Sequence, residues 1–313
     1  MCRWIAYLGD PINVGAVLYE PANSIIRQSL VSRLGVEATN GDGFGLGWYP
    51  QAVRAPLQYR TTAPAWGDPN LAEITRHLQS PCFLAHVRAT TGTAVQQTNC
   101  HPFRHGRWLF AHNGSIDGWP LVRRELMLAI DPALFPSVQG STDSEVMFLL
   151  ALGFGLDEDP IGAIERMAGL VERACAAAGA RQGLQMTVCA TDGSSLYAAR
   201  HATRGIPRSL FFTADAKTVK TMYPGNAKLG IYPDNARMVV SEPLADLPGA
   251  HHELPPGCAV RVTRGAIEQR AFTPRCWPSQ VPSAMLRAIP SPSCCSTSKV
   301  SPCSANESAS STR

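Results

Sequence analysis

The sequence lacks a long apolar run, a basic run interleaved with aromatic residues, and any CxxC pair. Because a membrane-spanning helix needs about 18 or more consecutive apolar residues, no membrane span is expected. The net charge of +4 gives no support for nucleic-acid binding. The spacing of the ten cysteines indicates neither a zinc ribbon nor a thioredoxin-type motif. With 45% hydrophobic and 17% charged residues, the composition is typical of an ordinary globular protein.

The two ends of the chain suggest a compartment and a domain organisation. Residues 1–10 are too short and too soon interrupted for a signal peptide, so we expect a cytoplasmic protein with reduced thiols. We predict that residues 2–275 form one folded unit. Residues 276–313 are rich in Ser, Pro and Cys and cannot bury much apolar surface. They are therefore predicted to form a disordered tail.

Local patterns predict strands first, then helices, then strands again. Alternating or apolar runs predict strands at 3–8, 82–87, 108–111, 184–190, 196–199, 210–213, 238–240 and 259–262. Helices are expected at 70–80, ending before Pro81, after the capping box 142–145, and at 160–179. Residues 40–49 predict a glycine-rich turn leading into a strand, and 112–114 predict a turn. This order favours a layered α+β fold.

Cys2 follows a lone initiator methionine, and this position has a specific chemical meaning. Removal of Met1 would place a thiol and a free α-amine on one residue. An α-amine has a pKa of about 7.7–8.0, so much of it is neutral at physiological pH. It can serve as the base for its own thiol, as in N-terminal nucleophile enzymes. A buried structural cysteine is the alternative interpretation of Cys2 taken alone.

Three further positions carry groups that would complete such a site. Arg88, at the end of a predicted strand, can bind a carboxylate, although arginines there more often form structural ion pairs. Asn113 and Gly114 can supply oxyanion donors, with a plain Asn-Gly turn as the alternative. Asp143, in a first helical turn, can bind an ammonium group, with simple capping as the alternative. Together they fit glutamine or a γ-glutamyl compound.

His101 lies between these signals, in Asn99-Cys100-His101-Pro102-Phe103. Its imidazole is a candidate general base. Since an N-terminal amine makes a separate base unnecessary, we interpret His101 as structural.

Six motifs occur in order: Met-Cys, Asn-Gly-Asp-Gly-x-Gly, His-Val-Arg-x-x-Thr, His-Pro-Phe, His-Asn-Gly and Ser-Thr-Asp-Ser-Glu. This series resembles the class II, N-terminal nucleophile glutamine amidotransferases over about residues 2–155, and more weakly to about 275. The resemblance implies a four-layer αββα sandwich. We also expect no metal and no cofactor. It implies Cys2 as nucleophile, Arg88 and Asp143 as binders of the substrate α-carboxylate and α-amine, and Asn113 with Gly114 as oxyanion hole. It also places Thr91 and Gly41 among the substrate-binding residues.

The later Val239-Val240-Ser241-Glu242-Pro243-Leu244 resembles the stand-alone, single-domain branch of that family. Other stretches, at 21–29 and 61–66, are similar to the fungal subunit that degrades glutathione with a peptidase-like partner. A hydrolase of the ergothioneine pathway is a more distant resemblance. We therefore predict an amidohydrolase that cleaves the γ-glutamyl amide bond of glutamine or a glutathione-like compound. The alternatives are an ammonia-supplying subunit of a separately encoded partner and a non-catalytic glutamine-binding subunit.

Overall fold

The structure is a computed structural model that describes residues 2–34, 39–51, 55–90 and 92–275. Within these residues the strands form two antiparallel sheets. The first sheet contains, in spatial order, β11 (His251–Glu253), β9 (Phe211–Thr213), β10 (Arg237–Val240), β1 (Arg3–Asn13), β4 (Gln79–Val87), β2 (Phe44–Trp48) and β3 (Leu57–Thr61). The second contains β13 (Ile267–Ala271), β12 (Cys258–Val262), β8 (Leu196–Ala202), β7 (Leu184–Thr191), β6 (Trp108–Ile116) and β5 (Phe103–His105). The predicted tail, residues 276–313, lies outside the described residues.

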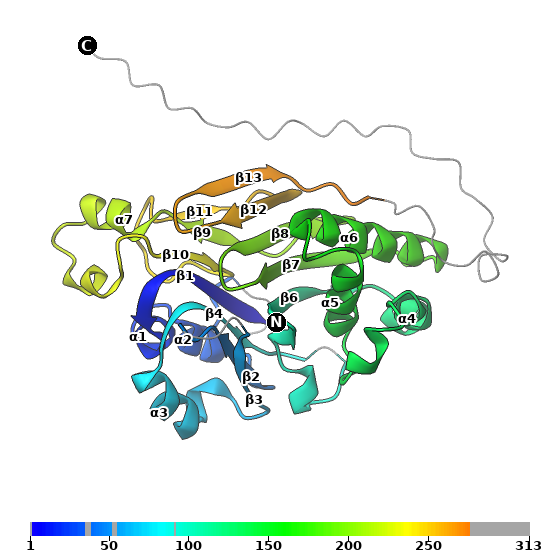
Figure 1. The fold of residues 1–313 in the computed structure, drawn as a ribbon, viewed down its shortest axis with the longest axis horizontal. Coiled ribbons are helices and arrows are strands. Elements are labelled where there is room, and N and C mark those ends of the chain that lie inside the picture. The colour runs from blue at the N-terminus through cyan, green and yellow to red at the C-terminus, as the bar shows by residue number, and fades with distance from the viewer. Residues whose placement is uncertain (1, 35–38, 52–54, 91, 276–313) are drawn as a thin grey trace, which may run out of the picture.

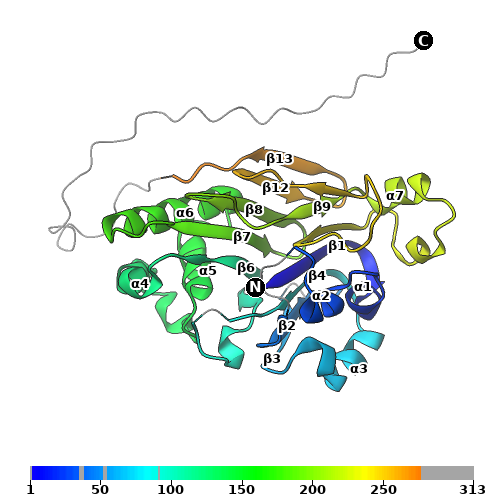
Figure 2. The ribbon, with the colours of Figure 1, turned by 180° about the vertical axis from the view of Figure 1, so that it is seen from behind.

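The helices are divided between the two sheets. The α-helices are α1 (Val14–Tyr19), α2 (Ile25–Leu30), α3 (Pro69–His77), α4 (Trp119–Leu128), α5 (Asp143–Gly153), α6 (Pro160–Ala177) and α7 (Ala216–Met222). Short 3-10 turns are η1 (Ala65–Gly67), η2 (Gln97–Asn99), η3 (Phe135–Ser137) and η4 (Ala227–Ile231). Helices α1–α3 lie beside β1–β4, whereas α4–α6 lie beside β6–β8 (Figure 1). The view from behind shows the same division (Figure 2).

Strand alternation explains why the two sheets pack face to face. Along β1, Trp4, Ala6 and Leu8 enter a buried cluster shared with Leu109 of β6, while the residues between them pack toward α1–α3. Successive side chains of a strand point to opposite faces, so one strand contributes to two apolar layers. Two sheets buried on both faces need helices outside, which yields the αββα sandwich expected from the resemblance. The sandwich is thereby confirmed.

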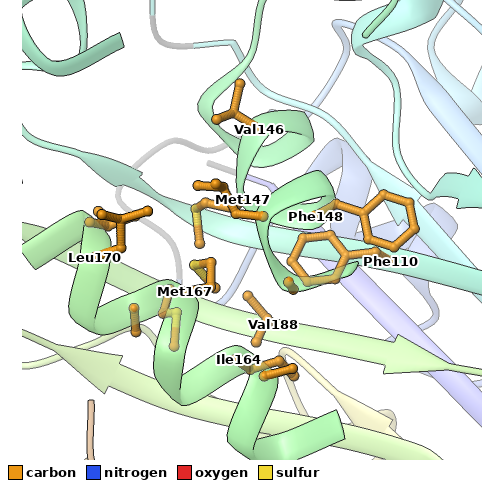
Figure 3. Close-up of a cluster of buried hydrophobic side chains, with 14 of the residues drawn as sticks. Phe110, Val146, Met147, Phe148, Ile164, Met167, Leu170 and Val188 are labelled. Atoms are coloured by element: carbon orange, nitrogen blue, oxygen red, sulfur yellow. The ribbon is translucent and has the colours of Figure 1, made fainter. Parts of the chain in front are cut away.

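The outer layer on the second sheet is a large apolar core formed with α5 and α6 (Figure 3). Phe148 of α5 stacks on Phe110 of β6 with ring centroids 5.2 Å apart. Such a pair contributes about 0.5–1.5 kcal/mol beyond the area that it buries. Met167 of α6 and Val188 of β7 belong to the same cluster. This core fixes the N-terminal end of α5 relative to β6, and both elements reach the candidate site.

Most predicted elements are present, with two corrections. The predicted turn at 112–114 is wrong, because β6 continues through these residues and pairs with Thr187 and its neighbours on β7. Pro81 lies inside β4, two residues beyond its start, although the sequence places it as a break. The capping prediction at α5 is confirmed for Thr142, whose hydroxyl accepts the Glu145 N–H at 3.2 Å. The Glu145 carboxylate instead accepts the N–H groups of 139 and 140.

Across the part of the chain that the structure describes, every helix is too short or too polar to traverse a bilayer.

Candidate active site

Cys2 lies immediately before β1, and the register of the first sheet places it beside the end of β4. Arg3 pairs with Val87, so the preceding Cys2 meets the segment that follows β4. Ala89 N–H donates to Cys2 Sγ, and the thiol donates to Ala89 O, both at 3.4 Å. Burial raises the pKa of the Cys2 thiol, opposed by the Ala89 N–H and by nearby cations. The thiol is therefore protonated at neutral pH and needs a base to become a nucleophile.

Arg88 is buried at the end of β4, with its guanidinium among loop atoms. Its Nη2 donates to Thr93 Oγ1 at 2.7 Å, to Thr90 Oγ1 at 3.2 Å and to Ala94 O at 3.2 Å. Its Nη1 donates to Asp42 O at 3.4 Å. The fixed charge sits on a rigid support, as recognition of a carboxylate requires.

Asp143 begins α5 and joins it to β6. Its Oδ2 accepts the Ile116 N–H at 3.0 Å, and its Oδ1 accepts the Ser144 N–H at 2.8 Å and the Ser144 hydroxyl at 3.1 Å. These donors hold the carboxylate in one orientation at the helix N-terminus, where negative charge is favoured.

Asn113 and Gly114 are consecutive residues of β6. Gly114 lines the cavity that contains Cys2, whereas Asn113 does not. Gly114 has φ +144°, and a Cβ there would come within 1.9 Å of Gln185 O on β7. No side chain fits at this position. Asn113 is buried between the sheets, and its Nδ2 donates to Ser241 Oγ at 3.0 Å.

A cavity of about 110 Å³ brings most of the predicted site residues together. Its described lining consists of Cys2, Arg88, Ala89, Thr90, Thr93, His101, His112, Gly114, Ser115, Thr142, Asp143, Ser144 and Arg208. Asn113 is not part of the described lining, although its neighbours His112 and Gly114 are. A larger, mainly apolar cavity of about 520 Å³ lies beside α7, and its described lining includes none of the predicted site residues.

Gly41 is also absent from this lining. Gly41 faces the Trp66 ring, where an added Cβ would come within 2.9 Å of Cη2. Its neighbour Asp42 is the residue that contacts the site, because its Oδ2 accepts the Thr90 N–H at 2.8 Å. Thr91 lies outside the described residues. The substrate-binding roles of Gly41 and Thr91 stay predictions.

The family follows from comparison with known proteins. Residues 20–280 match the family model of the class II glutamine amidotransferases. The chain belongs to this family. The matched range begins after Cys2, so this match does not test the predicted role of Cys2.

Individual relatives align with about half of this chain. The probable glutamine amidotransferase DUG3 of Saccharomyces cerevisiae is 39% identical over 160 residues, covering 49% of this chain and 45% of that protein. The gamma-glutamyl-hercynylcysteine sulfoxide hydrolase of Mycobacterium tuberculosis is 33% identical over 159 residues, covering 50% of this chain and 63% of that protein. The aligned part thus spans less than two thirds of either relative.

Solved structures agree with the sandwich. A glutamine aminotransferase class-II domain protein from Silicibacter pomeroyi superposes with a TM-score of 0.66 at 32% identity, covering 88% of this chain and 100% of that chain. The phosphoribosylpyrophosphate amidotransferase of Bacillus subtilis gives a TM-score of 0.59 at 16% identity, covering 88% and 50%. The second likeness concerns the fold alone.

Three buried histidines lie in or next to the candidate site. His86 Nε2 and His101 Nδ1 share a hydrogen bond of 2.8 Å, and His112 Nδ1 lies 2.8 Å from Ser144 Oγ. Burial lowers the pKa of His86 to about 3 and that of His101 well below its usual value. Burial also lowers the pKa of His112, opposed by Asp143. The imidazoles are therefore neutral at physiological pH and serve as hydrogen-bonding groups.

Sequence reasoning did not single out three further residues: Ser241, Glu242 and Arg208. Glu242 is fully buried. Its Oε1 accepts hydrogen bonds from Arg3 Nε at 2.7 Å and from the Leu34 N–H at 3.0 Å. Ser241 precedes it and contacts Asn113. The Ser-Glu-Pro-Leu segment was noticed only as a branch resemblance. An isolated Arg in a loop carries no local signal at all.

Proposed function

We propose that this chain hydrolyses the γ-glutamyl amide bond of glutamine or of a γ-glutamyl compound, with Cys2 as the nucleophile. The observation that carries the proposal is the single cavity lined by Cys2, Arg88, Gly114 and Asp143. These residues come from four different segments of the chain. Acyl transfer from an α-amino acid amide needs a nucleophile, here a thiol, and a cation and an anion that bind the α-groups of the substrate. It also needs a donor for the oxyanion, here a backbone N–H.

The substrate is held by its α-groups. Arg88 binds the α-carboxylate through its guanidinium, and Asp143 binds the α-ammonium. Both side chains are fixed by hydrogen bonds to protein, so little ordering is needed when the substrate binds. The γ-carbonyl carbon is then placed near Cys2 Sγ.

The chemical step begins after Met1 is removed. The Cys2 α-amine takes the thiol proton, and Sγ attacks the γ-carbonyl carbon. Negative charge develops on the carbonyl oxygen, where Gly114 N–H and the second Nδ2 hydrogen of Asn113 stabilise it. The C–N bond breaks as the leaving amine receives the proton from the α-ammonium.

The remaining γ-glutamyl thioester is hydrolysed. The α-amine accepts a proton from water, whose oxygen attacks the thioester carbon. Collapse of the second tetrahedral intermediate breaks the C–S bond, releases glutamate and returns the proton to Cys2 Sγ. Overall, one water is consumed, and one glutamate and one amine are formed.

Glutamate release tests this mechanism. Purified protein, with its N-terminus defined by intact mass, is incubated with glutamine and with γ-glutamylglycine. We expect Cys2→Ala to abolish release and Cys175→Ala, which removes a buried thiol of α6 that is not part of the cavity lining, to retain it. Undiminished release by Cys2→Ala, or by protein that keeps Met1, would overturn the mechanism.

A further inference from the structure

Arg208 is the second arginine that lines the cavity containing Cys2. It lies in the connection between β8 and β9, more than 60 residues along the chain from the other lining segments. The mechanism proposed above gives it no task. Its guanidinium therefore requires its own explanation.

The backbone on both sides of Arg208 is anchored. Pro207 O accepts Arg200 Nη2 at 3.2 Å, and Leu210 O accepts the Leu254 N–H at 2.8 Å. Ser209 Oγ donates to Ser241 O at 2.9 Å, next to the serine that contacts Asn113. These hydrogen bonds fix the backbone of the loop on both sides of Arg208. The position of the Arg208 side chain at the cavity is therefore well defined.

The Arg208 side chain has no protein partner among the residues that the structure describes. Its Nε is buried and has no acceptor. Two buried arginines elsewhere have anionic partners, Arg3 with Glu242 at 2.7 Å and Arg200 with Glu253 at 2.7 Å. Burial and, secondly, the nearby Arg3 lower the pKa of Arg208, as expected for a cation without an anion beside it. Arg208 is only partly buried, and a ligand anion would stabilise its partly desolvated charge.

A charge count indicates which part of the substrate supplies it. The γ-glutamyl group carries one carboxylate and one ammonium, which Arg88 and Asp143 match one for one. Arg208 adds a further positive charge to the same lining. Glutamine has no third charge, because its leaving group is ammonia. An amino acid or peptide leaving group has a free carboxylate, which fits the donor fork of a guanidinium.

We propose that Arg208 binds a carboxylate on the leaving-group side, so that the preferred substrates are γ-glutamyl amino acids or peptides rather than glutamine. This inference rests on the proposed function and assigns its substrate class. Arg208 is then a specificity residue that discriminates by the charge of the amine released.

Three substrates that differ in one group provide the test. Values of kcat/KM are measured for γ-glutamylglycine, for γ-glutamylglycinamide, in which the carboxylate is a neutral amide, and for glutamine. For the wild-type protein we expect γ-glutamylglycine to exceed γ-glutamylglycinamide by about 10- to 100-fold, the range for a hydrogen-bonded charged pair. This comparison needs no variant and does not depend on the folding of one.

Substitution then assigns the preference to Arg208. Arg208→Gln is expected to remove the preference for γ-glutamylglycine and to leave kcat/KM for γ-glutamylglycinamide and glutamine unchanged. Arg208→Lys, which keeps the charge but not the planar fork, is expected to retain part of it. Arg204→Gln is the matched control, because Arg204 is exposed in the same loop and is not part of the cavity lining.

The outcomes separate the two proposals. Equal wild-type rates on γ-glutamylglycine and its amide would overturn the role of Arg208 while leaving γ-glutamyl hydrolysis intact. An equal loss on all three substrates in Arg208→Gln would overturn it too, because Arg208 would then bind the glutamyl α-carboxylate. No glutamate release from any substrate would instead count against the proposed function.

Discussion

The Asn113 carboxamide is held by Ser241, whose Oγ accepts Asn113 Nδ2–H at 3.0 Å. The same hydroxyl accepts the Trp4 N–H at 3.0 Å and donates to Trp4 O at 3.2 Å. Trp4 is two residues from Cys2. One buried hydroxyl therefore links the strand that carries the proposed nucleophile to the side chain proposed for the oxyanion hole.

We expect Ser241→Ala to lower kcat with little change in KM. Loss of the acceptor leaves the Asn113 amide free to rotate, which weakens a contact made mainly in the transition state. Asn113→Ala removes the donor itself and should cost about 10²–10³ in kcat. The steady-state kinetics of both variants provide the measurement.

The double variant distinguishes positioning from mere destabilisation. If Ser241 acts through Asn113, adding Ser241→Ala to Asn113→Ala should reduce kcat little further. Fully additive losses, with thermal unfolding of the variants unchanged, would count against this coupling.

Local sequence patterns predicted the elements that support the site better than the site itself. Alternation identified β1 and β4, and the Thr142 cap identified the start of α5, because these signals lie within a few residues. Asn113-Gly114 has the local preference of a turn, yet β7 supplies a partner strand about 70 residues later. Tertiary pairing overrode the local preference.

Contacts between distant loops could not be predicted. Arg208 lies where the chain crosses from β8 in the second sheet to β9 in the first, and Ser241 follows β10, which pairs with β1. For Gly41, the resemblance implies a substrate-binding role that stays a prediction, and the structure shows only that an added Cβ there would meet the Trp66 ring. Motifs identify chemistry, but packing decides which atoms face the substrate.

Glu242→Gln should destabilise the fold by about 3 kcal/mol at pH 7, as expected for breaking a buried ion pair. Hydrogen bonds from Ser32 and the Arg3 charge outweigh burial and hold the pKa of Glu242 below its ordinary 4.5. The carboxylate therefore stabilises the fold above that value, and this stability is lost as the pH falls through the lower, folded-state pKa.

Thermal unfolding of wild type and Glu242→Gln between pH 7 and pH 3 checks this prediction. The difference between them should stay constant above about pH 5 and shrink at lower pH. A difference that grew on acidification would contradict the assigned direction.

Gly114→Ala should abolish both activity and the native fold of β6. The added Cβ would lie 1.9 Å from Gln185 O, and φ +144° is unfavourable for any other residue. Gly67→Ala is the matched control, since a Cβ there meets nothing within 4 Å. Circular dichroism and chemical unfolding of the two variants should separate them clearly; equal stability would show that β6 can shift away from β7.

The pH dependence of the reaction should report the Cys2 α-amine and not a histidine. The Cys2 thiol is protonated at neutral pH, so kcat/KM is expected to rise as the α-amine loses its proton near pH 7.7–8.0. The pKa of His86 is about 3 and that of His101 lies well below its usual value, so neither changes charge in this range.

The variant His101→Asn tests whether the Cys2 α-amine or the His101 imidazole causes the rise of kcat/KM with pH. Because His101 lines the cavity, its substitution can change the rate, but the apparent pKa of kcat/KM should stay the same. Proton NMR of the wild-type protein gives an independent measurement, in which the His86 and His101 ring signals should not titrate between pH 5 and 8. An apparent pKa that moved in His101→Asn, together with a titrating His101 signal, would make the imidazole the base. The α-amine would then lose its assigned role, and removal of Met1 would no longer be required for proton transfer.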